Sequence, residues 1–270
     1  MTVKHLCWLL LLLLPGCTTA PTGPDLTPHE LAPLAPPALM SPAAAYLHGI
    51  ELRDQNLLDR ARSYLQSAAE RGHADAQFEL GLWHLTGRDG RLDARQAARW
   101  LVMAADQGQA DALRYVWQLY LFGKGVEQDD ALALQWLRRG AEHGDPELCY
   151  RLGVWLYEGH SADPDPAQSA RWFLRAADGK VAGANYYLGV MLREGKGTQQ
   201  DDEMAFERFQ QGAKQGDPAC NLALGDCFRD GRGTRQSSSQ AAAHYRAAID
   251  QDDDQDVAKA ARARLNDLQR

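Results

Sequence analysis

An internal repeat of 36 residues constrains the fold of this chain more than any other feature of its sequence. A glycine returns at this interval through five units, at Gly87, Gly123, Gly159, Gly195 and Gly231. A column of large apolar residues keeps the same interval, at Leu80, Val116, Leu152, Leu188 and Leu224. An aromatic column runs beside it, at Tyr64, Trp100, Trp136 and Trp172, and continues one place later at Phe209 and Tyr245. A regular repeat of this length predicts a row of similar units that stack on one another.

Each unit is predicted to be a pair of helices. β-branched residues are scarce, whereas Ala, Leu, Gln and Arg are abundant, which favours helix over strand. The apolar column stands directly before a glycine in four of the five units. A glycine in mid-helix lets a neighbouring helix approach closely, although it costs about 1 kcal/mol in helix propensity. The glycines that begin at Gly87 end this first helix, because glycine tolerates the left-handed C-cap conformation. The second helix ends at Gly72, Gly108, Gly144 or Gly216.

The stretch from Ala112 to Gly144 shows the repeated pattern most completely. It reads Gly123-Lys124-Gly125-Val126, then Asp130, Ala133, Trp136-Leu137 and Ala141. This pattern resembles the Sel-like repeat (SLR) family, which is related to the tetratricopeptide repeats, and the resemblance covers about residues 58–250. It implies an all-α, right-handed α-solenoid of about six helix pairs with a C-terminal capping helix. It also implies a scaffold or adaptor without catalytic activity.

The solenoid domain is predicted to occupy residues 43–270. Its units are expected at 43–73, 74–109, 110–145, 146–181, 182–217 and 218–253, and its capping helix at 256–268. Two places depart from the pattern. Trp117 stands where other units have the mid-helix glycine, so the packing must open there or the indole must leave the seam. The loop after Gly159 lacks the Lys-Gly-Val sequence and contains Asp163-Pro164, so that turn is expected to be rebuilt.

Residues 1–16 resemble the signal peptide of a bacterial lipoprotein precursor. The apolar run from Leu6 to Leu14 is too short to cross a bilayer as a mature helix. It ends in Leu14-Pro15-Gly16-Cys17, which resembles a lipobox, and the resemblance implies that Cys17 carries the acyl chains of a stable membrane anchor. Thr18 follows Cys17 in place of the Asp that signals retention at the inner membrane. The predicted address is therefore the cell envelope, on the periplasmic side of the outer membrane. The alternative is an ordinary secretory peptide with an incidental cysteine.

Residues 17–42 are predicted to be the lipidated cysteine and a proline-rich tether. Proline cannot donate to a helix ladder and biases the residue before it toward extended geometry. Four residues of this stretch are unusually apolar for a spacer, so part of the tether is expected to pack on the first helices: Leu31, Leu34, Leu39 and Met40.

Charge and motifs exclude several classes of function. The net charge is −7 and no basic face stands out, so nucleic acid is not an expected partner. Gly195-Lys196-Gly197-Thr198 lacks the spacing of a phosphate-binding loop, and the Asp-rich stretch from Asp250 to Asp256 lacks the glycine and glutamate of a calcium loop. No catalytic signature is present. The sequence therefore predicts neither an enzyme nor a protein with a metal, a cofactor or a small-molecule substrate.

Three cysteines remain after Cys17. Cys220 and Cys227 are seven residues apart on one predicted helix, about 10 Å along its axis, which is too far for a disulfide. Cys149 lies two units before them. All three are predicted to be small buried apolar residues.

The first helices line the concave face in tetratricopeptide-like solenoids, and the resemblance implies the same face here. Counted from the Leu-Gly pair, three columns of side chains should point to that face. The predicted partner-binding residues are Phe78, Leu82, Arg114, Gln118, Phe122, Tyr150, Glu158, Tyr186 and Glu194. Aromatic and Arg side chains with an acidic edge are typical of binding grooves. The alternative is that the aromatic residues of the first column pack between repeats.

These features bear on three possible functions. The first is a scaffold in the envelope that recruits partner proteins through the concave face. The second is an immunity protein that neutralises a toxic effector acting on the envelope, such as a phospholipase. The third, an enzyme that acts on peptidoglycan or β-lactams, lacks any catalytic constellation. Because the same repeat fold serves different tasks, the choice between the first two rests on analogy.

Overall fold

The computed structural model describes residues 36–88, 92–160, 164–251 and 256–268. This part of the chain contains thirteen α-helices and one short 3-10 helix, with no strand. The helices are α1 (Pro42–Asp54), α2 (Leu58–Glu70), α3 (Ala74–Thr86), α4 (Ala94–Asp106), α5 (Ala110–Phe122), α6 (Asp130–Glu142), α7 (Pro146–Glu158), α8 (Pro166–Asp178), α9 (Ala182–Glu194), α10 (Asp202–Lys214), α11 (Pro218–Asp230), α12 (Ser238–Gln251) and α13 (Asp256–Asp267).

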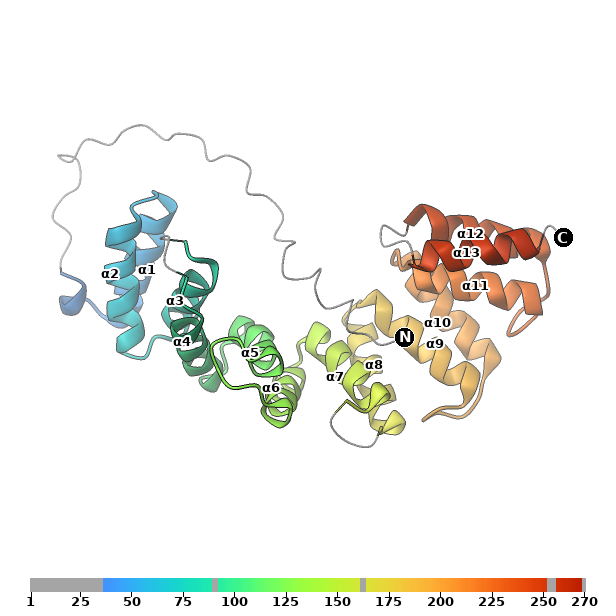
Figure 1. Ribbon diagram of the computed structural model, residues 1–270, viewed down its shortest axis with the longest axis horizontal. Helices are drawn as coiled ribbons and strands as arrows, with labels where there is room; N and C mark the ends of the chain where they lie inside the picture. Colours follow the sequence, from blue (N-terminus) through green and yellow to red (C-terminus); the bar gives the residue numbers. More distant parts are fainter. Residues whose placement is uncertain (1–35, 89–91, 161–163, 252–255, 269–270) are drawn as a thin grey trace.

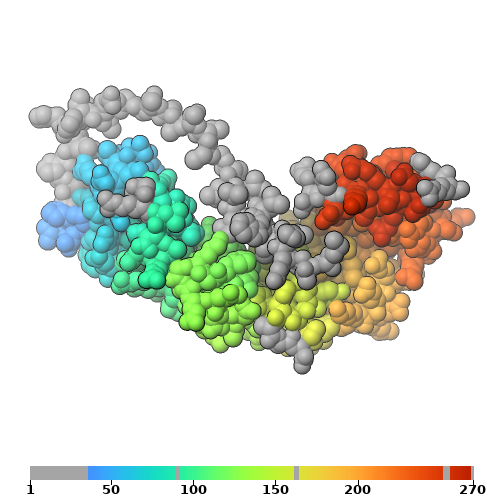
Figure 2. Space-filling model, in the orientation of Figure 1, coloured from blue at the N-terminus to red at the C-terminus, as the bar shows by residue number. Residues whose placement is uncertain are grey.

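The helices form a bowed row of hairpins. Each odd-numbered helix from α1 to α11 packs most extensively on the even-numbered helix that follows it, and each pair then packs on the next pair. The hairpins succeed one another from α1 and α2 at one end to α11 and α12 at the other, where α13 closes the row (Figure 1). In the same view the middle units lie lowest and the two ends of the row rise on either side (Figure 2). The prediction of an all-α solenoid of adjacent helix pairs with a C-terminal helix is confirmed.

The mid-helix glycines bring the two helices of a hairpin into close contact. A Cβ atom at Gly81 would lie 2.6 Å from Cγ of Leu101, and the same conflict arises between Gly225 and Tyr245 at 2.3 Å. The close approach expected from the sequence is therefore confirmed. Trp117, which replaces this glycine in α5, is only 5% exposed, so its indole stays in the core. Its Nε1 has no hydrogen-bond partner in the described part of the chain, which carries a desolvation cost.

The aromatic column was predicted in the wrong register for its last two members. Phe209 and Tyr245 are fully buried, and they align with the equally buried column one place after the tryptophans: Leu65, Leu101, Leu137 and Phe173. The true successors of Trp172 at the repeat interval are Arg208 and His244. The last two units therefore have no indole at this place.

Aspartates cap the second helices of the four middle hairpins, α4, α6, α8 and α10. The side chain of Asp129 accepts a hydrogen bond from the backbone N–H of Leu132 at the start of α6. Asp93, Asp165 and Asp201 cap α4, α8 and α10 in the same way. Asp129 stands one place before the helix, where its side chain can reach the free N–H groups of the first turn.

The loops between paired helices also join neighbouring units. Gly125 has φ +74°, and a Cβ there would lie 1.9 Å from the carbonyl oxygen of Ala94 at the start of α4. Gly233 has the same relation to the carbonyl oxygen of Asp202 at the start of α10. The second loop glycine therefore permits a backbone contact with the preceding hairpin, which a larger residue would prevent.

The chain just before α1 is fastened to α2. Arg71 donates hydrogen bonds to the carbonyl oxygens of Met40, at 2.6 Å, and Pro37, at 3.2 Å. Met40 packs against the first core cluster, whereas Leu39 is 80% exposed. The signal peptide, Cys17, Leu31 and Leu34 lie outside the described residues. In the described part of the chain, no helix is long and apolar enough to span a bilayer.

The three cysteines Cys149, Cys220 and Cys227 are free and buried, as predicted.

Candidate protein-binding surface

The nine predicted binding residues lie on the first helices of four successive hairpins. They come from α3 (Phe78, Leu82), α5 (Arg114, Gln118, Phe122), α7 (Tyr150, Glu158) and α9 (Tyr186, Glu194). Arg114, Phe122 and Glu194 are exposed, and the other six are half-buried.

Three tyrosines of α7 and α9 gather around the ring of a fourth, Tyr187. The ring of Tyr187 stacks on Phe173 with centroids 4.8 Å apart. It meets Tyr150, Tyr157 and Tyr186 edge-on, with centroids 5.9, 5.5 and 5.7 Å away. We call these four residues, Tyr150, Tyr157, Tyr186 and Tyr187, the tyrosine cluster. All four are half-buried, so each combines a packed ring with access to the surface.

Burial keeps the phenols of the tyrosine cluster neutral. Loss of solvation raises the pKa of Tyr150 to about 12. The pKa values of Tyr157, Tyr186 and Tyr187 are also raised, chiefly by burial. A neutral phenol both donates and accepts a hydrogen bond, so the cluster offers polar contacts that do not change over the physiological pH range.

Charged groups of both signs surround the tyrosine cluster. Lys196 Nζ stands 3.8 Å from the ring centroid of Tyr157, a cation–π distance. The guanidinium of Arg151 lies 5.6 Å from the ring centroid of Tyr150 and pairs with Glu147. His160 Nε2 lies 2.6 Å from Glu158 Oε2. Aromatic rings with a charged rim are the usual anatomy of a protein interface.

The aromatic residues of the first column also hold neighbouring hairpins together. Phe78 meets Tyr115 of the next hairpin with centroids 6.0 Å apart, and Tyr150 meets Tyr187 in the same manner. The alternative named from the sequence, packing between repeats, therefore applies to Phe78 and Tyr150, and both side chains stay half-buried. The column is not a continuous aromatic stripe, because Arg114 stands between them and pairs with Asp111 and Asp145.

Sequence reasoning missed Tyr187, the central ring of the cluster. A signal was present, because Tyr115 and Tyr187 are two repeats apart in one column. Each stands 37 residues after an aromatic residue of the first column, which is the spacing of the observed ring contacts.

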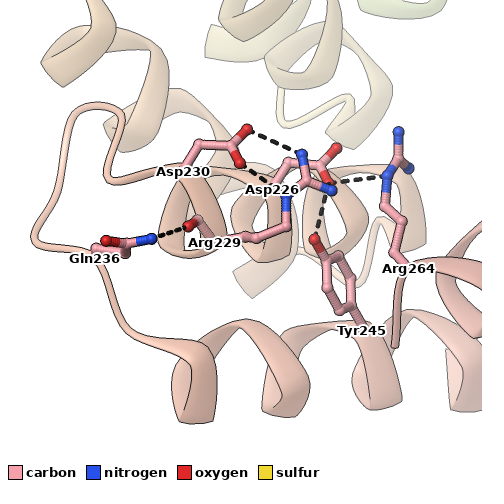
Figure 3. Close-up of polar contacts among 6 residues, drawn as sticks. All are labelled: Asp226, Arg229, Asp230, Gln236, Tyr245 and Arg264. Carbon is pink, nitrogen blue, oxygen red and sulfur yellow. Dashed lines mark hydrogen bonds and ion pairs between the residues drawn. The ribbon is translucent and has the colours of Figure 1, made fainter. Parts of the chain in front are cut away.

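The C-terminal end of the same face is occupied by an ion-pair network (Figure 3). Asp226 accepts a hydrogen bond from the hydroxyl of Tyr245 at 2.9 Å, and its Oδ1 lies 2.9 Å from Nε of Arg264 and 3.2 Å from Arg229. Arg229 also binds Asp230, and this hydrogen bond lowers the pKa of Asp230. The network joins α11, α12 and α13. The carboxylate of Asp226 is therefore already engaged in contacts that hold these helices together.

The described residues contain no group of three or more His, Cys, Asp or Glu side chains that could hold a metal ion.

Comparison with known sequences gives one clear result. The sequence matches the Sel1 repeat six times, at residues 39–73, 74–109, 112–145, 146–181, 182–217 and 218–253. No curated protein sequence matches the chain.

Solved structures show the same fold. A protective antigen present in uropathogenic Escherichia coli strains, which has an SLR fold, is 26% identical with a TM-score of 0.74, over 84% of this chain and 49% of that one. This chain thus spans about half the length of that antigen. A Sel1 repeat protein from Oxalobacter formigenes is 25% identical with a TM-score of 0.72, over 77% of this chain and 86% of the other. An immunity protein from Pseudomonas aeruginosa is 20% identical with a TM-score of 0.43, over 83% and 86% of the two chains, and this similarity concerns the fold alone.

Proposed function

The chain belongs to the Sel1 repeat family, and from this premise we propose that it is a non-catalytic scaffold that binds a protein partner through the first helices of its hairpins. Sel1 repeats form scaffolds typical of protein–protein interaction. The site would lie on α3, α5, α7 and α9, with the tyrosine cluster at its centre.

The tyrosine cluster is the observation that supports this proposal most. Tyrosine is among the residues that contribute most to binding energy at interfaces, because it gives a large rigid contact with a polar tip. The cluster is pre-organised, since Tyr187 contacts four other rings. A partner would therefore pay little conformational entropy to order these side chains.

The proposed location is the periplasmic side of the outer membrane, with Cys17 as the site of lipid attachment. The lipobox resemblance at Leu14-Pro15-Gly16-Cys17 supports this proposal. The attachment of the chain before α1 to α2 through Arg71 would make the N-terminal hairpin the end of the solenoid nearest to the tether.

The test is co-purification from the native envelope with variants that leave the core intact. Phe122→Ala with Glu194→Lys changes two exposed residues of the predicted surface, one on α5 and one on α9. Arg99→Glu with Met103→Ala changes two exposed residues of the second helix α4 and serves as the matched control. The proposal expects the first pair to lose a partner that the control retains. If both variants keep the same partners, the binding surface lies elsewhere.

The identity of what is lost separates a scaffold from an immunity protein. A set of envelope-assembly proteins lost together indicates a scaffold. A single stoichiometric partner with lipase-like toxicity indicates immunity.

A further inference from the structure

A hollow of about 380 Å³ opens between α10, α11 and α12, away from the tyrosine cluster. We call it the α10–α12 pocket. Its walls combine apolar residues with five polar or charged side chains from three helices: Lys214 and Gln210 of α10, Asn221 of α11, and His244 and Gln251 of α12.

The pocket lies at the place where the last unit lacks an indole. Trp136 and Trp172 occupy the corresponding place on α6 and α8, where they pack against the central core cluster. Trp100 occupies it on α4, where it belongs to the N-terminal core cluster and is 7% exposed. His244 stands at this place in the last unit, and its imidazole is much smaller than an indole. The smaller imidazole therefore leaves open at α12 a space that an indole fills in three other hairpins.

His244 is held in one orientation and one tautomer. Its ring stacks on Phe228 with centroids 5.4 Å apart, and its Nδ1 lies 3.0 Å from Oδ1 of Asn221. Asn221 donates its own amide to Oε1 of Gln251 at 2.8 Å, so its Oδ1 must be the acceptor and Nδ1 of His244 the donor. Nε2 is then an acceptor that the hairpin does not use in these bonds. Burial lowers the pKa of His244, which favours the neutral ring.

The charge at the pocket also departs from the repeat. The position of Lys214 is acidic in the other units, at Glu70, Asp106, Glu142, Asp178 and Asp250. Lys214 is exposed and is the one Lys or Arg among the described residues that line the pocket. Two repeat columns thus change at the same pocket. His244 replaces the tryptophan of one column, and Lys214 replaces the acidic residue of the other.

We propose that the α10–α12 pocket binds an aromatic side chain of a partner protein, Trp or Tyr, that has a carboxylate beside it. The ring takes the place that Trp136 and Trp172 take in their own hairpins. Its N–H or O–H donates to Nε2 of His244, and the neighbouring carboxylate pairs with Lys214. This contact goes beyond the proposed function, because it lies on other helices than the tyrosine cluster and specifies the chemistry of the partner.

The test is a ¹⁹F NMR titration of the full-length chain with two short peptide probes. Both are blocked tetrapeptides with a central 5-fluorotryptophan, preceded by Asp in one and by Lys in the other. His244→Trp fills the pocket with the residue that the repeat uses elsewhere, so the fold should tolerate it. Lys214→Glu restores the acidic residue that the other units have at this position. Gln240→Trp adds an indole at an exposed position of α12 outside the pocket and is the matched control.

The proposal expects saturable binding of the Asp probe in the millimolar range or tighter. The Asp probe should bind about threefold more tightly than the Lys probe, as expected for an exposed ion pair, and Lys214→Glu should reverse this preference. His244→Trp should weaken binding at least about tenfold, while Gln240→Trp should not. Absence of saturable binding, or equal binding by His244→Trp and the unaltered chain, would overturn the proposal. Thermal unfolding followed by circular dichroism shows that each variant is folded.

Discussion

The ring of Phe209 lies against the backbone of Gly189 so closely that a Cβ atom at Gly189 would come within 2.3 Å of its Cε1. Phe209 is fully buried, so its ring cannot move aside without disturbing the core. This contact joins α9 and α10 and is repeated in kind along the solenoid.

Gly189→Ala should therefore destabilise the chain. Overpacking of a buried site costs about 1–3 kcal/mol, and the gain in helix propensity of about 1 kcal/mol offsets only part of it. Urea unfolding followed by circular dichroism measures the difference. Gly183→Ala on the same helix is the control, because Gly183 is half-buried and its Cβ would meet only the side chain of Tyr150, at 3.1 Å. Equal loss in both variants would contradict this explanation.

The fold could be predicted because residue types that recur every 36 positions can be recognised directly in the sequence. The glycine and leucine columns identified the hairpins, and the C-caps identified where the first helices end. The register of Phe209 and Tyr245 did not follow, because two adjacent columns on one helix face both accept aromatic residues. Only packing shows that Phe173, Phe209 and Tyr245 share the place that faces the glycine.

The candidate site was predictable only in part. Helix periodicity placed the nine residues on one set of helices, and it showed which columns carry aromatic side chains. It could not reveal that Tyr187 is the ring on which the others converge, since that contact joins two hairpins. Backbone acceptors carry no residue-specific signal either, so the bonds from Arg71 to the Pro37 and Met40 carbonyls were also invisible in the sequence.

Tyr187→Ala should lower stability far more than Tyr187→Phe. The truncation removes a half-buried ring that contacts Phe173 and three tyrosines, which costs about 2–4 kcal/mol. The phenylalanine keeps these contacts. Thermal denaturation checks this, with Tyr115→Ala in the same repeat column as the control, because Tyr115 meets only Phe78 among the aromatic rings described. If the two alanine variants lose the same stability, Tyr187 is not the central packing residue of the tyrosine cluster.

Asp226→Asn should loosen the C-terminal helix before the rest of the chain. The substitution removes the charge that pairs with Arg229 and Arg264, while an amide can still accept from Tyr245. Because the Asp226 side chain is only 15% exposed, loss of its two ion pairs should cost more stability than loss of a surface ion pair. Hydrogen exchange should show faster exchange in α13 with little change in α3 and α4. Asp230→Asn, at a side chain 42% exposed, should have a smaller effect.

Alkaline pH should destabilise the chain through the tyrosine cluster. The pKa of Tyr150 is raised from 10.0 to about 12 by burial, so the folded state favours the protonated phenol. Its contribution is complete below about pH 10 and is lost as the pH rises toward 12. Tyr150→Phe should make the fall in unfolding free energy less steep. Absorbance of tyrosinate at alkaline pH gives the titration directly, and a Tyr150 that ionises at its ordinary pKa would contradict the burial described.

Cys17→Ser should release the protein from the membrane fraction. A serine cannot form the thioether to a lipid, and without acyl chains the described helices offer no other anchor of sufficient apolar length. Cell fractionation measures the release, and mass spectrometry of the mature N-terminus identifies the acyl groups. Retention of Cys17→Ser in the outer membrane would show that another part of the chain, or a partner, holds it there.

The contact between each loop glycine and the preceding hairpin also has a consequence for how the chain folds. The backbone of Gly125 lies close to that of Ala94, and Gly233 lies close to Asp202, so each of these contacts between units closes a loop of only about one repeat. Low contact order of this kind favours rapid folding. A chain that emerges from its N-terminus can therefore complete each hairpin as the next one arrives, without waiting for its end. The ion pair of Asp226 in the last hairpin forms only once Arg264 of α13 has been made, so the docking of α13 follows the folding of that hairpin.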